Sequence, residues 1–142
     1  MKVEPYLFFN GRCDEAIEFY KKAVGAKVGF LVRYKDSPEP PQPGHSLPHG
    51  WGEKVMHSNL VIGETMVMAS DGDSSSKASF NGFQLSLAAS DEAEARRTFA
   101  ALSEGGQVRV PLIKTFFSSA FGMLEDKFGI GWMVMVATQP KS

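Results

Sequence analysis

The chain opens with an apolar run that gives way to a helical spacing of apolar positions. Residues 3–9 are apolar and aromatic with Pro5 near the start, which predicts a strand buried on both faces. Residues 13–24 carry apolar side chains at Ala16, Ile17 and Tyr20, with acidic residues early and lysines late. This pattern predicts a helix that ends before Gly25, since glycine is the usual residue at a helix C-terminus.

The rest of the first half predicts strands around one long loop. Residues 26–34 read as a strand, and residues 54–62 and 65–70 read as a hairpin that turns at Gly63–Glu64. Residues 36–53 hold most of the prolines, His45, His49 and Trp51, so we expect an irregular arm there. The polar stretch 71–79 is predicted to be a connector.

The second half repeats this order of elements. Residues 83–88 predict a strand, and Ser90 is the expected N-cap of a helix over 91–104. Residues 107–113 predict a strand in which Pro111 indicates a sheet edge or a bulge. Residues 120–125 and 131–137 predict a closing hairpin, with the Asp126 side chain stabilising the turn.

Two short matches support an internal repeat. The tripeptide Met-Val-Met occurs at 66–68 and at 133–135, and Asp-Glu-Ala occurs at 14–16 and at 91–93. The order strand, helix, strand, strand, strand therefore occurs twice, and an internal repeat changes the expected fold. We predict an α+β fold of two βαβββ modules, residues 1–72 and 78–138, within one domain over 1–142.

Composition narrows the class of partner. The 142 residues have 43% hydrophobic content and a formal net charge of −1, which argues against nucleic acid as a main partner because that needs a concentrated basic surface. No apolar stretch approaches the length that spans a bilayer, so we expect no membrane partner. Cys13 is the single cysteine and excludes an intrachain disulfide, which favours a cytoplasmic location.

Four segments together resemble the PhnB-like branch of the vicinal oxygen chelate superfamily, which includes glyoxalase I, bleomycin-resistance proteins and extradiol dioxygenases. They are PYLFFNGRCDEAIEFYKKAVGAK, MHSNLVIGETMVMASD, ASFNGFQLSL and FGMLEDKFGIGWMV, and with the order between them they cover nearly the whole chain. The resemblance implies paired βαβββ modules, with mostly antiparallel curved sheets, helices outside and a cavity. It also implies a homodimer.

In metal-dependent members of that superfamily, the resemblance implies four His or Glu ligands, one from the first and one from the last strand of each module. The corresponding positions here are Pro5 or Tyr6, Met66 or Met68, Phe83 or Gln84, and Met133 or Met135. None is His, Asp or Glu, and a thioether is a poor ligand for hard or borderline divalent ions. We therefore predict no metal in the usual place and no cofactor.

The two methionines of each pair lie two residues apart on a predicted strand, so they point to the same face. One interpretation is an apolar cavity wall that adapts to a small organic molecule, because methionine fills irregular space. The other is plain core packing. The first interpretation gives a predicted ligand-binding set of Tyr6, His57, Met66, Met68, Phe83, Phe117, Trp132 and Met133, with core packing an equal alternative for Phe117 and Trp132.

His57 is the candidate catalytic residue, because it is the only histidine on a predicted regular element and imidazole titrates near neutral pH. The alternative is a half-buried histidine satisfied by the backbone or by a cross-strand partner. His45 and His49 are a poor zinc pair, since prolines and glycines exclude a helix there. Cys13 lies near a helix N-terminus, where a thiolate is favoured, but a small apolar helix residue is the default.

Three functions follow as hypotheses. The first is a homodimeric protein that binds a small organic molecule without the usual metal ligands. The second is a divalent-metal-dependent lyase, isomerase or dioxygenase with displaced ligands such as His57, Glu64 or Glu125, although the sequence favours a solvated turn residue for Glu64. The third is an interaction role through residues 36–53. A methyltransferase label is sometimes attached to the branch, but no glycine-rich loop opens a Rossmann-type unit for a methyl donor.

Overall fold

The computed structural model describes residues 1–38, 47–75 and 77–137, in two compact units, Met1–Ala78 and Ser79–Ser142. The boundary between the units lies at the end of the predicted polar connector, residues 71–79. Each unit contains one four-stranded sheet and one α-helix. The expected α+β fold with repeated βαβββ order is confirmed.

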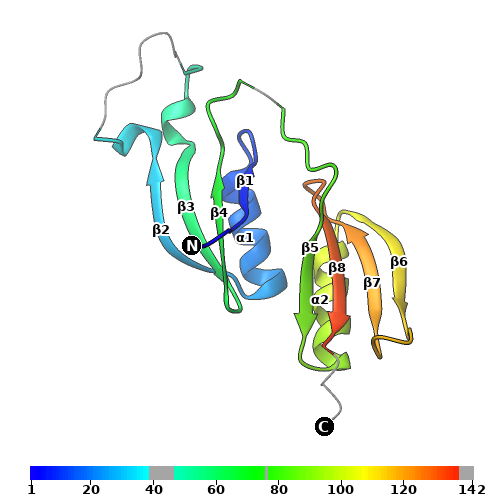
Figure 1. Cartoon of the computed structure of the whole chain (residues 1–142). Helices are drawn as coiled ribbons and strands as arrows, with labels where there is room; N and C mark the ends of the chain where they lie inside the picture. The colour runs from blue at the N-terminus through cyan, green and yellow to red at the C-terminus, as the bar shows by residue number, and fades with distance from the viewer. Residues whose placement is uncertain (39–46, 76, 138–142) are drawn as a thin grey trace. The chain divides into compact units, whose positions relative to one another are not determined.

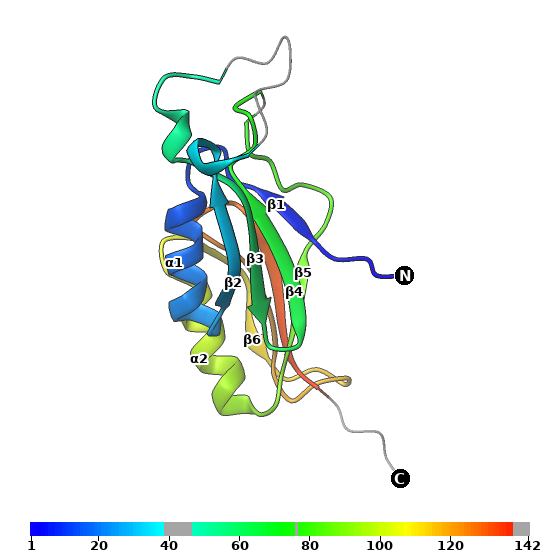
Figure 2. The ribbon, with the colours of Figure 1, turned by 90° about the vertical axis from the view of Figure 1, so that its left-hand side faces the viewer.

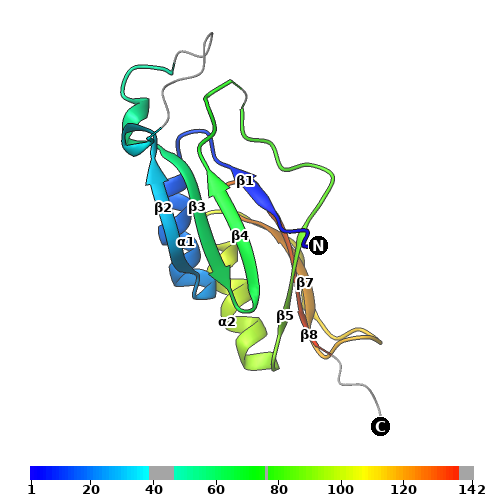
Figure 3. The same cartoon turned by 60° about the vertical axis from the view of Figure 1, so that its left-hand side comes forward.

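Unit 1 runs through β1 (Tyr6–Phe8), α1 (Cys13–Val24), β2 (Lys27–Arg33), β3 (Val55–Ile62) and β4 (Thr65–Ser70). Its sheet order is β1-β4-β3-β2, in which β1 and β4 are parallel and the other pairs are antiparallel. Helix α1 lies against one face of this sheet (Figures 1 and 2). Within residues 1–38, 47–75 and 77–78, no helix lies against the other face of this sheet (Figure 3).

Unit 2 runs through β5 (Leu85–Ala89), α2 (Glu92–Ser103), β6 (Gln107–Ile113), β7 (Phe121–Glu125) and β8 (Gly131–Val136). Its sheet order is β5-β8-β7-β6, again with the first pair parallel and the others antiparallel. Helix α2 covers one face (Figure 1). The two units therefore share one topology.

Both helices bury one stripe against their sheet. In α1 the buried residues include Ala16, Ile17 and Tyr20, as the sequence spacing predicts, and Gly25 ends the helix with a left-handed φ of 67°. In α2 the buried stripe includes Phe99 and Leu102. Helical periodicity therefore located both cores correctly.

The predicted N-cap of the second helix is wrong by one residue. Asp91 caps α2, and its side chain accepts a hydrogen bond from the Glu94 backbone N–H at 2.8 Å. The Ser90 hydroxyl instead donates to the Glu94 carboxylate at 2.8 Å. Both residues are good N-caps by type, so only the φ and ψ angles at the helix start separate them.

The Asp-Glu-Ala match does not mark equivalent helix positions. Ala16 lies in the buried stripe of α1, whereas Ala93 lies exposed at the start of α2. Both Met-Val-Met runs lie on the last strand of their unit, each with a buried valine between two half-buried methionines. The repeat is real, but only one of the two matches that suggested it is structural.

Both predicted first strands need correction. Strand β1 covers only Tyr6–Phe8, and it buries Leu7 while Tyr6 and Phe8 stay 38% and 51% exposed. Only the face of β1 that carries Leu7 is therefore buried, and the face that carries Tyr6 and Phe8 is not. Strand β5 begins at Leu85, so Phe83 precedes it and is 45% exposed.

Strand β6 lies at a sheet edge, as Pro111 predicted. Its pairing with β7 shifts register after Val108 and again after Val110. Edge position and bulges are where a strand tolerates proline, because its missing N–H then breaks no ladder bond. Strand β2, the corresponding edge of unit 1, is also irregular at two places.

The predicted arm over 36–53 is described only at its ends, which hold two short 3₁₀ helices, Tyr34–Asp36 and Trp51–Glu53. His45 lies outside the described residues, and His49 is exposed. Trp51 is fixed to unit 1, because its indole N–H donates to the Gly72 carbonyl at 2.9 Å. Among the helices of the described chain, none is long and apolar enough to cross a membrane.

Candidate functional site

The face of the unit 1 sheet opposite α1, which we term the helix-free face, is apolar and half-exposed. Burial alternates along β4, where Val67 and Ala69 are buried and Met66 and Met68 are intermediate. Strand register brings Tyr6, Met68, Asn59 and Phe30 into one row across the four strands. The methionine pair therefore shares a face, as predicted, and this face is not the one that packs on the helix.

Three polar side chains form a continuous chain on this face. The Tyr6 hydroxyl lies 2.8 Å from His57 Nδ1, and His57 Nε2 lies 2.8 Å from the Asn59 side-chain oxygen. His57 and Asn59 lie two residues apart on β3, so they point to the same side of the sheet. Tyr6 joins them from β1, two strands away in the sheet order.

With the Asn59 side-chain oxygen facing Nε2, one neutral tautomer of His57 fits both hydrogen bonds. The Asn59 oxygen can only accept, so His57 Nε2 carries a hydrogen and donates it. In the neutral imidazole Nδ1 then has a lone pair, and it accepts the hydrogen of the Tyr6 hydroxyl. Both ring nitrogens are thus satisfied by side chains, and the sequence alternative of a cross-strand partner applies here.

Aromatic rings surround the Tyr6–His57 pair. Tyr6 stacks on Phe8 with ring centroids 4.8 Å apart, and Phe30 lies 6.2 Å from the His57 ring. Burial raises the pKa of the Tyr6 hydroxyl above its ordinary value, because the phenolate would lose solvation there. Tyr6 is therefore a neutral hydroxyl at physiological pH, with its hydrogen directed at His57.

The corresponding face of the unit 2 sheet, opposite α2, has methionines but lacks a polar chain like Tyr6–His57–Asn59. Met133 and Met135 are half-buried on β8, and the β5 residues opposite them are Ser86 and Ala88. Phe121 faces Met135, and Phe117 contacts Phe121 edge-on at a centroid distance of 5.1 Å. Phe117 therefore belongs to the rim of an apolar face.

Register also locates the positions at which the resemblance implied metal ligands. Tyr6 and Met68 are paired across β1 and β4, so the expected first-strand and last-strand positions of module one do come together. In module two the residues paired with the methionines are Ser86 and Ala88, whereas Phe83 and Gln84 precede β5. No imidazole or carboxylate occupies any of these positions, and the described chain contains no cluster of three His, Cys, Asp or Glu side chains.

The two displaced carboxylates considered from the sequence have ordinary surroundings. Glu64 is exposed in the turn between β3 and β4. Glu125 belongs to unit 2 and forms an ion pair with Arg109 across β6 and β7. His57 forms its hydrogen bonds with Tyr6 and Asn59 instead.

Trp132 does not lie on the face of the unit 2 sheet opposite α2. It is 3% exposed on the helix side of β8, and its indole N–H donates to the Asp126 carboxylate at 2.9 Å. The core-packing alternative for this residue is therefore confirmed. Asp126 also accepts from the backbone N–H groups of Phe128 and Ile130, which confirms its predicted role in the turn.

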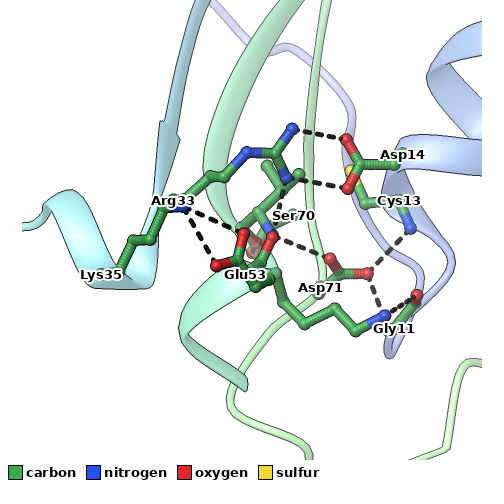
Figure 4. A network of polar contacts seen from close by, with 10 residues as sticks. Gly11, Cys13, Asp14, Arg33, Lys35, Glu53, Ser70 and Asp71 are labelled. Carbon is green, nitrogen blue, oxygen red and sulfur yellow. Dashed lines mark hydrogen bonds and ion pairs between the residues drawn. The ribbon is translucent and has the colours of Figure 1, made fainter. Parts of the chain in front are cut away.

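A second polar cluster of unit 1 lies where β4 ends beside the start of α1 (Figure 4). Asp71 is 2% exposed, and it accepts three hydrogen bonds from backbone N–H groups, those of Gly11 at 2.7 Å, Cys13 at 2.8 Å and Val55 at 2.9 Å. Arg33 forms a two-pronged ion pair with Asp14 nearby. Asp71 therefore supplies α1 with the cap that Arg12, at the N-cap position, does not provide.

Cys13 is a buried core residue. It has no exposed surface, and burial, followed by the Asp71 charge, raises the pKa of its thiol to about 12. The thiol is therefore protonated at any physiological pH, despite its position at a helix N-terminus. The default interpretation from the sequence is the right one, because desolvation outweighs the helix dipole here.

The sequence identified Tyr6, His57 and Met68 but missed Asn59, Phe8 and Phe30. Asn59 could have been found from the sequence. It lies two residues from His57 on one strand, so the His57 ring and the Asn59 amide point to the same face. Phe30 could not have been found in this way, because the pairing of β2 with β3 shifts register between Val28 and Phe30. Alternation fails as a guide on a bulged strand.

Comparison with known proteins identifies the family. The family model for 3-demethylubiquinone-9 3-methyltransferase matches residues 1–135. The chain belongs to this PhnB-like family. The resemblance drawn from the four sequence segments is therefore confirmed.

Individual relatives match over nearly their full lengths. Protein YjdN of Escherichia coli K12 is 33% identical over 98% of this chain and 97% of its own. The crystal structure of protein PA1353 from Pseudomonas aeruginosa is 38% identical, covers 98% and 99% of the two chains, and gives a TM-score of 0.82. The PhnB protein from Bacillus cereus is 24% identical over 96% and 100%, with a TM-score of 0.77.

Two more distant structures share the fold alone. They are the fosfomycin resistance protein FosX from Mesorhizobium loti, at 11% identity over 97% and 92% of the chains and a TM-score of 0.64, and a glyoxylase/bleomycin resistance protein/dioxygenase domain from Frankia, at 14% over 99% and 95% and 0.62. The α+β architecture of the PhnB-like chain is therefore the glyoxalase-like fold.

Proposed function

We propose that this PhnB-like protein binds a small organic molecule on the helix-free face of unit 1, without a metal ion. The observation that carries the proposal is a half-exposed apolar surface with one organised polar chain, Tyr6–His57–Asn59, within it. Apolar walls with a few convergent polar groups are the usual composition of small-molecule sites. The metal-dependent alternative has no donor set in its favour, because Tyr6 and Met68 occupy the paired positions.

The family description alone does not lead us to propose methyl transfer. A fold hosts many functions, so activity must be argued from the site. The polar chain on the helix-free face contains a phenol, an imidazole and an amide, which are hydrogen-bonding and proton-transfer groups. We also propose a cytoplasmic location, which the single cysteine favours.

Methionine methyl signals give a direct test of the binding site. With all seven methionines labelled by ¹³C at the methyl group, we expect a panel of small planar aromatic compounds to shift Met66 and Met68. Met1, which is fully exposed, serves as the internal control and should not shift. Dialysis against Zn²⁺ should leave the Met68 methyl signal unchanged, because the Met68 thioether and the Tyr6 phenol are weak ligands for this ion.

Two outcomes would contradict the proposal. If no compound in the panel moves Met66 or Met68 while other methyl signals respond, the helix-free face of unit 1 is not the binding site. If Zn²⁺ at one equivalent shifts Met68 and this shift disappears in the His57→Ala protein, the metal-dependent enzyme with displaced ligands becomes the better reading.

We further propose a homodimer. Large apolar side chains outside the helix-free face of unit 1 are strongly exposed in the chain as described, among them Ile113 and Phe116. Exposed apolar patches and free strand edges are features that a partner chain covers. Light scattering at micromolar concentration should give twice the 15.5 kDa chain mass. A monomeric mass under these conditions would contradict the dimer and leave the binding proposal intact.

A further inference from the structure

The polar chain Tyr6–His57–Asn59 has the arrangement of an acid–base relay. A donor hydroxyl meets a basic nitrogen at 2.8 Å, and the other ring nitrogen is held by a third side chain at 2.8 Å. This order of groups, in which a third residue orients the base, is the general logic of an activated hydroxyl. We propose that these three residues take up the proton of an acidic hydroxyl on a bound ligand, a step that deepens the binding proposal and rests on it.

The proton transfer is balanced without a metal or a co-reactant. The ligand O–H bond breaks, and its proton passes to the Tyr6 oxygen. At the same time Tyr6 gives its own hydroxyl hydrogen to His57 Nδ1. The products are a ligand oxyanion, a neutral Tyr6 that donates to that oxyanion, and a His57 imidazolium whose Nε2–H is held by Asn59.

The direction of the Tyr6 hydrogen sets the class of ligand. Because that hydrogen is donated to His57, the Tyr6 oxygen presents only lone pairs to a molecule on the helix-free face. A carboxylate would meet these lone pairs with its own, which is unfavourable. A neutral hydroxyl donates to them, so the site selects a phenol or an enol over a carboxylate.

The surroundings favour a planar ligand. Tyr6 and Phe8 stack with ring planes 20° apart, and Phe30 lies on the other side of His57 as part of the same row as Tyr6 and Met68. Aromatic rings gain by offset stacking with other flat π-systems. Conjugated phenols and enols combine this flatness with an acidic hydroxyl, and their oxyanions are delocalised.

The optical probe 4-nitrophenol tests the relay, because its phenolate absorbs visible light and its phenol does not. Equilibrium dialysis measures binding, and absorbance at a fixed near-neutral pH measures the phenolate fraction of the bound probe. We expect the phenolate-to-phenol ratio to rise about tenfold on binding, the size of one unit of pKa. Tyr6→Phe and His57→Gln should abolish this rise, and His49→Gln, an exposed histidine outside the sheet, should retain it.

The two measurements separate the relay from the binding proposal. Binding by dialysis with an unchanged phenolate ratio would overturn the relay alone. An equal rise in the wild-type and His57→Gln proteins would overturn it as well. If dialysis shows no binding of this or any other planar phenol, the binding proposal and the relay are both wrong.

A ligand-free measurement tests the same arrangement. In protein labelled with ¹⁵N-histidine, His57 should show the neutral tautomer with hydrogen on Nε2 at slightly alkaline pH. Asn59→Leu should convert this signal to a mixture of tautomers, because the acceptor is gone, whereas Asn81→Leu, at an exposed loop position, should leave it unchanged. Hydrogen on Nδ1 in the wild-type protein would overturn the relay.

Discussion

Replacing Asp71 with alanine should lower the free energy of unfolding by about 3–5 kcal/mol, because three buried backbone donors lose their acceptor at once. The carboxylate binds the N–H groups of Gly11, Cys13 and Val55, which belong to the β1–α1 loop, the helix start and strand β3. Asp71 is 2% exposed, so the carboxylate is shielded from solvent. Urea denaturation followed by circular dichroism measures the change.

Asp71→Asn separates the two carboxylate oxygens. Oδ1 accepts from Gly11 and Cys13, and an asparagine oxygen can keep both bonds. The amide nitrogen would then face the Val55 N–H, two donors against each other, so we expect a smaller loss of about 2 kcal/mol. Asp36→Ala is the matched control, because this aspartate is exposed, and it should stay within about 0.5 kcal/mol of wild type. If Asp36→Ala and Asp71→Ala lower the free energy of unfolding equally, the proposed role of the Asp71 hydrogen bonds is wrong.

The second large effect is expected at Asp126 in unit 2. Asp126→Ala should cost about 3 kcal/mol, because the Phe128 and Ile130 backbone N–H groups and the Trp132 indole all lose their acceptor. Asp126 is 3% exposed, and its bonds to the Ile130 N–H and the Trp132 indole are buried. Urea denaturation followed by circular dichroism measures the loss.

Hydrogen exchange locates the damage. Loss of protection should concentrate in β7 and β8, which the Asp126 turn joins, and α1 should keep its protection. The reverse pattern is expected for Asp71→Ala, in which α1 and β3 lose protection. If either variant loses protection evenly over both units, the aspartate stabilises more than its own unit and the local explanation is wrong.

These two aspartates set the stability, whereas Tyr6, His57 and Asn59 are proposed to set the function. The distinction follows from which groups they bind. Asp71 and Asp126 are occupied mainly by backbone N–H groups of their own unit, and the functional chain is side chain to side chain on a half-exposed face. Substitutions in the second group should therefore change ligand behaviour with little loss of stability.

Local patterns in the sequence determined the elements and their order. Apolar spacing placed both helices, Gly25 ended the first, Pro111 marked an edge strand, and Met-Val-Met marked the last strand of each module. Such features depend on neighbours within a few residues, so one chain suffices to read them. The errors at Ser90 and Phe83 are boundary errors of one or two residues, where propensity cannot choose between adjacent candidates.

Only the tertiary structure decided which residues meet. Asp71, predicted to begin a solvated connector, is a buried cap because β4 ends beside the start of α1. Trp132 and Met133 are neighbours in sequence but lie on opposite faces of β8, one bonded to Asp126 and the other half-exposed. Tyr6 reaches His57 only because β1 pairs with β4, and β4 with β3, in one register. The β3–β4 register follows from the tight turn between the two strands, but β1 and β4 are parallel and far apart in the sequence, so no turn fixes their register.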